Sequence, residues 1–263
     1  MLAREARGLA GALVCLVCFV YLVGPDRPDR QDRPNELNSE PMPVKNFIPP
    51  RRLLLGPGPS MVHPRVLRAL STPLLGHLDP AFLALMDDIQ ALLRFVFQTK
   101  NRFTIAVSGT GSAGMEASMV NIVEPGDAVI IGINGLFGTR LATIVERCGG
   151  KAILVEAPWG QIIEPDAIEA SLRRSGPVKA VAIVHAETST GARQPLEPIA
   201  RLCRDHDALF VVDAVTSLGG APVEVDHWDI DVCYSATQKC LSCPPGLSPF
   251  TLSDRAMAAI RAR

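Results

Sequence analysis

Short apolar runs rich in β-branched residues alternate with segments of helical periodicity, and this alternation constrains the fold more than any other feature. The expected strands are Thr104–Val107, Ala128–Ile133, Lys151–Val155, Ala180–Val184, Leu209–Val212, Asp231–Tyr234 and Ser248–Leu252. The expected helices include Gly114–Val123, Phe137–Cys148, Pro165–Arg174 and Leu196–His206. The pattern predicts an α/β fold with a mostly parallel sheet covered by helices, in which ligands bind at the carboxyl ends of the strands.

Charge and cysteine content exclude several classes of protein. The 263-residue chain has a formal net charge of -1 and no long Lys/Arg run, which argues against a nucleic-acid-binding surface. Its seven scattered cysteines favour a reducing compartment over a disulfide framework. The pairs Cys15/Cys18 and Cys240/Cys243 have C-x-x-C spacing, but neither lies in the strand and helix context of a zinc ribbon or thioredoxin motif. We therefore expect no metal site.

The first 50 residues differ in composition from the rest of the chain. Arg4 and Arg7 precede an apolar run over residues 9–23, which is typical of a signal sequence or membrane anchor. The alternative is that this segment comes from a start codon assigned too early. We expect a cytoplasmic location, and a membrane anchor formed by residues 9–23 is the other interpretation. Residues 24–50 are rich in Pro, Asp and Arg, and this composition predicts a disordered linker.

A glycine-rich segment follows the first expected strand. In Ser108-Gly-Thr-Gly-Ser-Ala-Gly114, the bare backbone and the hydroxyls of Thr110 and Ser112 suit a phosphate at a helix N-terminus. The same segment matches G-x-G-x-x-G, but a dinucleotide site needs an acidic residue after the next strand, and Asn134-Gly135 stands there. A single phosphate is the favoured interpretation, and a plain tight turn remains the alternative.

Two charged residues end later strands. Asp213 follows the run Leu209–Val212, where an acid is most often a helix cap, and Lys239 follows the next strand, where a lone lysine is most often a solvated charge. Together with the glycine-rich segment, however, they meet at one edge of the expected sheet. Pyridoxal 5'-phosphate needs a phosphate anchor, a carboxylate for its ring nitrogen and an amine for its aldehyde, so the combination indicates this cofactor.

The stretch from Leu53 to Asp254 resembles the large domain of class V aminotransferases, in the alanine–glyoxylate and serine–pyruvate branch. The matching pieces, in order, are Leu-Leu-Leu-Gly-Pro-Gly-Pro-Ser at 53–60, Ser-Gly-Thr-Gly at 108–111, Glu-Pro-Gly-Asp at 124–127, Asn-Gly-Leu-Phe-Gly at 134–138, His-Ala-Glu-Thr-Ser-Thr-Gly at 185–191, Val-Asp-Ala-Val-Thr-Ser-Leu-Gly-Gly at 212–220 and Ser-Ala-Thr-Gln-Lys-Cys-Leu at 235–241. The resemblance implies a pyridoxal-phosphate-dependent transferase fold of type I, with residues 51–263 as the cofactor-binding large domain.

The resemblance also implies a role for each matching site residue. Thr110, Gly111 and Ser112 would contact the cofactor phosphate, and Gln238 would help to hold it. Thr188 would reach the ring hydroxyl, Asp213 would pair with the ring nitrogen, and Lys239 would form the Schiff base. Phe137 stands where these enzymes usually stack a tryptophan on the ring, and the alternative is that it is an ordinary core residue. His185 and Glu187 are expected to support the site.

Transamination is the activity that the resemblance implies, from alanine or serine to glyoxylate or pyruvate, in a homodimer. A cysteine desulfurase or lyase is the alternative within the family, but those enzymes usually carry histidines where Gln238 and Phe137 stand here. Members of the family continue into a smaller C-terminal domain with the arginine that binds the substrate carboxylate. We expect this domain to be missing after Arg263, which leaves a non-catalytic cofactor-binding fragment as a further alternative.

Overall fold

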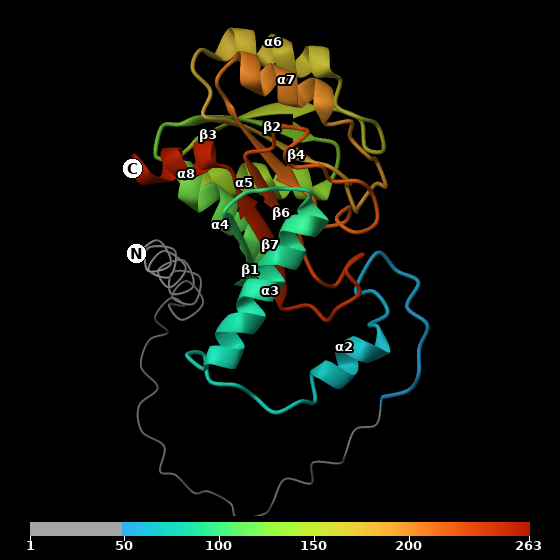
Figure 1. Cartoon of the computed structure of the whole chain (residues 1–263). Coiled ribbons are helices and arrows are strands. Elements are labelled where there is room, and N and C mark those ends of the chain that lie inside the picture. The colour runs from blue at the N-terminus through green and yellow to red at the C-terminus, as the bar shows by residue number, and fades with distance from the viewer. Residues whose placement is uncertain (1–48) are drawn as a thin grey trace, which may run out of the picture.

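Six of the seven strands of the central sheet run in the same direction, in a computed structural model that describes residues 49–263. The strand order is β1-β7-β6-β5-β4-β2-β3, and only β7 is antiparallel to its neighbours (Figure 1). The strands are β1 Phe103–Ser108, β2 Ala128–Ile133, β3 Lys151–Glu156, β4 Ala180–Val184, β5 Leu209–Asp213, β6 Val232–Tyr234 and β7 Leu247–Leu252. The carboxyl ends of all strands except β7 therefore lie at one edge of the sheet.

Helices cover both faces of this sheet. The helices of the described structure are α2 Pro64–Ala69, α3 Pro80–Phe97, α4 Gly111–Ile122, α5 Leu136–Arg147, α6 Pro165–Ser175, α7 Glu197–Asp205 and α8 Asp254–Arg261. Helices α4, α5 and α8 lie on one face, while α6, α7 and the end of α3 lie on the other (Figure 1). Helix α2 has no buried residue and covers neither face. The arrangement is a three-layer α/β structure, as the alternating pattern predicts.

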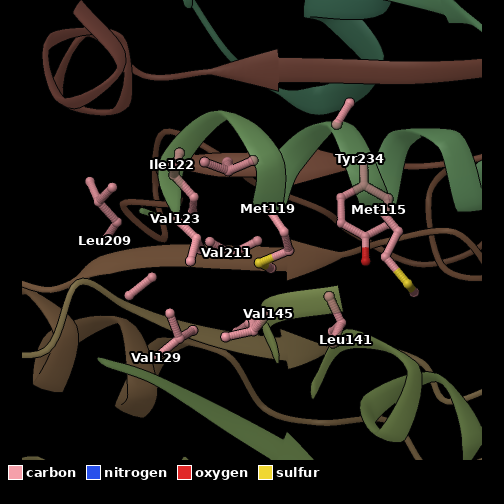
Figure 2. Packing of buried hydrophobic residues seen from close by; sticks show 14 of the residues in the cluster. Met115, Met119, Ile122, Val123, Val129, Leu141, Val145, Leu209, Val211 and Tyr234 are labelled. Carbon is pink, nitrogen blue, oxygen red and sulfur yellow. The ribbon is translucent and has the colours of Figure 1, made fainter. Parts of the chain in front are cut away.

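The core lies in two layers because successive strand residues point to opposite faces. In β2, Val129 and Ile131 face the helices α4 and α5, whereas Ile130 faces α6. Figure 2 shows the first of these layers, where Met115 and Met119 of α4 lie over the strands. Each fully buried aliphatic side chain of this kind contributes roughly 1.5–3 kcal/mol, so the two layers hold the strand ends in fixed relative positions.

Every strand was predicted to within one residue at each end, but the helices differ more from expectation, since α2, α3 and α8 were not among those expected. Helix α4 begins at Gly111 rather than Gly114, which places the predicted phosphate residues Gly111 and Ser112 in its first turn. Helix α3 begins after Asp79, whose side chain accepts a hydrogen bond from the backbone N–H of Ala81 at 2.8 Å.

The predicted N-terminal apolar segment at residues 1–23, and all but the end of the predicted linker at 24–50, lie outside the described residues. Over residues 49–263, no helix is both long and apolar enough to cross a membrane.

Candidate functional site

Three of the predicted site segments meet at the carboxyl edge of the sheet. A Cβ atom built on Gly111 would lie 2.9 Å from the Cβ of Ala236 and 3.0 Å from Cγ2 of Val215. Val215 is two residues after Asp213, and Ala236 is three residues before Lys239. Only a glycine fits at this contact, so the first turn of α4 packs directly against the loops that carry the aspartate and the lysine.

The first turn of α4 presents polar groups that suit an anion. Thr110 is the N-cap residue, yet its side chain makes no capping hydrogen bond within the described part of the chain. Its carbonyl accepts the N–H groups of Ala113 and Gly114, whereas the hydroxyls of Thr110 and Ser112 are on exposed residues. The N-terminal end of a helix carries a partial positive charge, so this turn is a candidate site for the predicted phosphate.

Asp213 is a buried carboxylate at the end of β5, with 3% of its surface exposed. Its Oδ1 accepts the N–H of Val215 and its Oδ2 accepts the hydroxyl of Tyr234, both at 2.9 Å. Burial raises the pKa of Asp213 from 3.8 to about 6, and the two hydrogen bonds oppose this rise. Among residues 49–263, no cation forms an ion pair with it. No helix starts directly after it, so the simpler helix-cap interpretation is wrong.

Lys239 lies in the loop after β6, half-buried beside a segment near the start of the described chain. Its Nζ donates a hydrogen bond to the carbonyl oxygen of Pro57 at 2.7 Å. The same two segments carry two buried polar atoms that have no hydrogen-bond partner in the described structure, Oε1 of Gln238 and Oγ of Ser60. Buried polar atoms are nearly always paired, so these two are candidate contacts for a bound ligand.

Hydroxyl and imidazole groups connect the end of β4 to the loop after Asp213. The hydroxyls of Thr188 and Thr216 are hydrogen-bonded to each other, and Nδ1 of His185 contacts the hydroxyl of Ser217 at 2.9 Å. Burial, followed by the nearby Arg193, lowers the pKa of His185 to about 4, so its imidazole is neutral at pH 7. The predicted supporting role of His185 is thus a structural contact with the aspartate loop.

Phe137 is fixed at the start of α5 by Glu187, which is fully buried. One carboxylate oxygen of Glu187 accepts the backbone N–H of Phe137 at 2.9 Å, and the other accepts the N–H and hydroxyl of Ser189 at 3.0 and 2.7 Å. The guanidinium of Arg140 lies 5.2 Å from the centre of the Phe137 ring and donates to the hydroxyl of Ser112 at 3.2 Å. Phe137 also packs against the core, which agrees with the interpretation of it as a core residue, while its stacking on a cofactor ring stays a prediction.

Sequence reasoning missed three residues that contact the predicted site: Arg140, Thr216 and Tyr234. Arg140 was detectable in principle, since residues three apart on a helix lie on the same face and Phe137 had been singled out. Tyr234 ends β6 and so faces the neighbouring strand end at Asp213. Cys240 and Cys243 are free thiols, and no cluster of potential metal ligands occurs within residues 49–263.

Comparisons with known proteins place the chain in a family. A family model described as "Aminotransferase class-V" matches residues 53–262. The (S)-ureidoglycine–glyoxylate transaminase of Bacillus subtilis is 46% identical over 214 residues, which are 81% of this chain and 51% of that protein. The alanine–glyoxylate aminotransferase of Rattus norvegicus is 40% identical over 230 residues, 88% of this chain and 54% of that protein.

A solved structure gives the same result. The alanine–glyoxylate aminotransferase from Nostoc sp. is 52% identical and matches with a TM-score of 0.82, covering 84% of this chain and 59% of that one. The predicted resemblance and fold are therefore confirmed. The chain spans about half the length of the curated relatives it matches. Because the family model covers almost all of the described residues, the chain belongs to the class V aminotransferase family.

Proposed function

We propose that the protein is a pyridoxal-phosphate-dependent transaminase in which Lys239 binds the cofactor. The observation that carries this proposal is the contact of Gly111 with Val215 and Ala236, which brings the phosphate-type turn, Asp213 and Lys239 to one edge of the sheet. A phosphate anchor, a carboxylate and an amine are the three groups that this cofactor requires.

The described residues fit this cofactor. Asp213 is buried, its pKa is raised, and it has no cationic partner among them, so a protonated ring nitrogen would supply the charge that it lacks. Oε1 of Gln238 is a buried acceptor without a partner, next to the lysine. The hydroxyls of Thr110 and Ser112 and the first turn of α4 would hold the phosphate, and the Thr188 hydroxyl would reach the ring hydroxyl.

When bound, pyridoxal phosphate withdraws electrons from the α-carbon of an attached amino acid. Asp213 would keep the ring nitrogen protonated, and Tyr234 and Val215 hold its two oxygens in place for this role. Once the substrate amine has displaced Lys239, its Nζ would take the proton from the substrate α-carbon and return it at another carbon. Phe137, fixed by Glu187, would pack against the ring.

The names of the relatives suggest the substrates. The enzymes from Bacillus subtilis and Rattus norvegicus are both named for glyoxylate as one substrate, while the other is ureidoglycine or alanine. We therefore propose glyoxylate or pyruvate as the acceptor, alanine or serine as the donor, and a homodimer as the assembly. The test is to incubate the protein with each donor and glyoxylate and to measure glycine formation.

A visible absorbance band that stays with the protein after free pyridoxal phosphate is removed, and that is lost on borohydride reduction, tests the central assignment. Lys239→Ala should abolish this reducible band, whereas Lys151→Ala should keep it, because Lys151 begins β3 at the opposite edge of the sheet. A reducible band that persists in Lys239→Ala would refute the assignment.

Cofactor binding without catalysis is a second candidate. Adding alanine to the cofactor-loaded protein separates the two functions. A transaminase converts the visible band to that of the pyridoxamine form and produces pyruvate, whereas a binding protein keeps its band. Release of sulfide from cysteine would instead support the desulfurase alternative.

A further inference from the structure

The segment Pro57–Ser60 packs against Lys239 and is hydrogen-bonded to the loop that carries this lysine. The carbonyl of Pro57 accepts the hydrogen bond from Nζ of Lys239 at 2.7 Å. The backbone N–H of Ser60 donates to the carbonyl of Gln238 at 2.8 Å, and the N–H of His63 donates to the carbonyl of Ser242 at 3.3 Å. The lysine therefore lies beside two backbone hydrogen bonds that join the same two segments, although 182 residues separate it from Pro57.

Gly58 brings bare backbone against the lysine side chain. A Cβ atom at this position would lie 2.7 Å from Nζ, 2.9 Å from Cδ and 3.0 Å from Cε of Lys239. Its φ of +146° is a conformation that residues with a side chain rarely adopt. The backbone conformation thus favours glycine here, and any side chain at this position would displace the end of the lysine side chain from the Pro57 carbonyl.

We infer that Pro57 and Gly58 form a holding site that positions the Lys239 amine whenever it is not bonded to the cofactor. This inference rests on the proposed function, in which the lysine is released and recaptured in each cycle. The carbonyl accepts one N–H of the lysine. Once the nitrogen has given up its extra proton, its lone pair is free to form a bond while this hydrogen bond holds it in place. When free cofactor first binds, Nζ would form a C=N bond with its aldehyde carbon, and the aldehyde oxygen would leave as water. At the end of each cycle Nζ would form the same bond, and the amine of the product amino acid would leave instead.

The test compares two ligands that differ at one group. Pyridoxal phosphate has the aldehyde that reacts with the lysine, whereas pyridoxine 5'-phosphate has an alcohol there and binds without reacting. In Gly58→Ala, displacement of the amine should slow formation of the reducible band at least about tenfold. The dissociation constant of pyridoxine 5'-phosphate should stay within about twofold of that of the original protein, because the phosphate and ring contacts are unchanged.

Two glycine variants are matched controls. Gly56 lies two residues away and Gly160 shares a positive φ, of +90°, but neither has an atom within 4 Å of a built Cβ in the described structure. Gly56→Ala and Gly160→Ala should form the band at the original rate. Formation at the original rate in Gly58→Ala, or an equal loss of pyridoxine 5'-phosphate binding, would overturn the inference.

A second measurement needs neither the cofactor nor a folded Gly58→Ala variant. Lys239→Met keeps an unbranched side chain as far as the ε position, with sulfur in place of the δ-carbon, and removes the amine, so the Pro57 carbonyl loses its donor. Hydrogen exchange of the peptide containing Ser60 should then speed up severalfold in the cofactor-free protein. Unchanged exchange would show that the amine is not held there and would overturn the inference. If the original protein forms no reducible band, the proposed function fails, and this exchange result still decides whether the amine is held.

Discussion

Asp213 and Asp231 are equally buried aspartates at opposite edges of the same sheet, each with 3% of its surface exposed. Asp231, just before β6, accepts the N–H of Phe210 at 2.9 Å and the hydroxyl of Ser253 at 2.7 Å, and forms an ion pair with Arg255 at 3.0 Å. Asp213, at the carboxyl edge, accepts two hydrogen bonds and forms no ion pair among the described residues, and the charge of Lys239 is the last of the influences that lower its pKa. The chain itself supplies partners for the Asp231 carboxylate, whereas the Asp213 carboxylate can still bind a cationic group of a ligand.

This difference distinguishes a structural charge from a functional one. Burying a carboxylate is unfavourable unless a cation or several donors compensate. At Asp231 the compensation comes from the chain itself, whereas at Asp213 burial raises the pKa to about 6. A buried carboxylate with a raised pKa is typical of functional sites, although structural networks also shift pKa values. The predictions below test whether Asp231 is a structural charge and Asp213 a functional one.

The largest expected effect is the loss of the Asp231 network. Asp231→Ala leaves the half-buried Arg255 without its buried carboxylate partner, and breaking a buried ion pair of this kind typically lowers the free energy of unfolding by about 3–5 kcal/mol. Urea unfolding of the cofactor-free protein measures this change. The cofactor affinity of the molecules that remain folded should be unchanged.

Asp207 offers a matched control for Asp231. It pairs with the same arginine at 3.1 Å, but its side chain is 99% exposed. Exposed ion pairs contribute little, so Asp207→Asn should leave the urea midpoint nearly unchanged. Equal losses in the two variants would contradict the distinction between the partnered and the exposed carboxylate.

A smaller effect of opposite sign is expected at Asp213. Its pKa is higher in the folded protein than the unfolded value of 3.8, so the folded state binds this proton more tightly and the contribution of Asp213 to stability falls as the pH rises from 3.8 to about 6. Asp213→Asn removes the buried charge. The cofactor-free variant should therefore be more stable than the original protein by about 2–3 kcal/mol at pH 8, with the gain disappearing below pH 3.8.

The same substitution should impair the site while it stabilises the fold. A neutral amide in place of the Asp213 carboxylate cannot balance a protonated ring nitrogen, so the alanine half-reaction should slow by at least about a hundredfold, comparable to the loss of a general acid–base group. Urea unfolding at pH 8 and stopped-flow absorbance measure the two effects. A variant that loses stability at pH 8 would show that Asp213 is a structural charge like Asp231.

The comparison also shows what the sequence could predict. The strands and the group Gly111, Asp213 and Lys239 were predicted because strand periodicity places residues at a known edge of a parallel sheet. The contacts of Tyr234, Glu187 and the Pro57 carbonyl were not predicted. Each joins segments that are distant in sequence, so it depends on how neighbouring loops pack, and no local spacing encodes that. Asp231 was missed for the same reason, since its partners come from β5 and from the start of α8.

Glu187 provides an intermediate case, a carboxylate at the functional edge whose partners all come from the fold. Glu187→Gln removes the charge that faces the N-terminus of α5, and the loss of such a cap typically lowers stability by about 1–2 kcal/mol. Thermal unfolding measures this change. The control is Glu197→Gln, which removes an exposed acid in the first turn of α7 and should lower stability by only a few tenths of a kcal/mol.

The smallest expected effect is at Arg140, which connects the ring of Phe137 to the hydroxyl of Ser112. A guanidinium over an aromatic ring at an exposed site contributes about 0.5–1 kcal/mol, so Arg140→Gln should weaken cofactor binding by roughly two- to fivefold. Fluorescence titration with pyridoxine 5'-phosphate measures the change. Arg147→Gln, in the last turn of the same helix, removes the same charge without this ring contact and should bind like the original protein. An equal weakening in both variants would mean that Arg140 acts through net charge alone. Only a loss of cofactor affinity that is confined to Arg140→Gln would add Arg140 to the site residues that sequence reasoning identified.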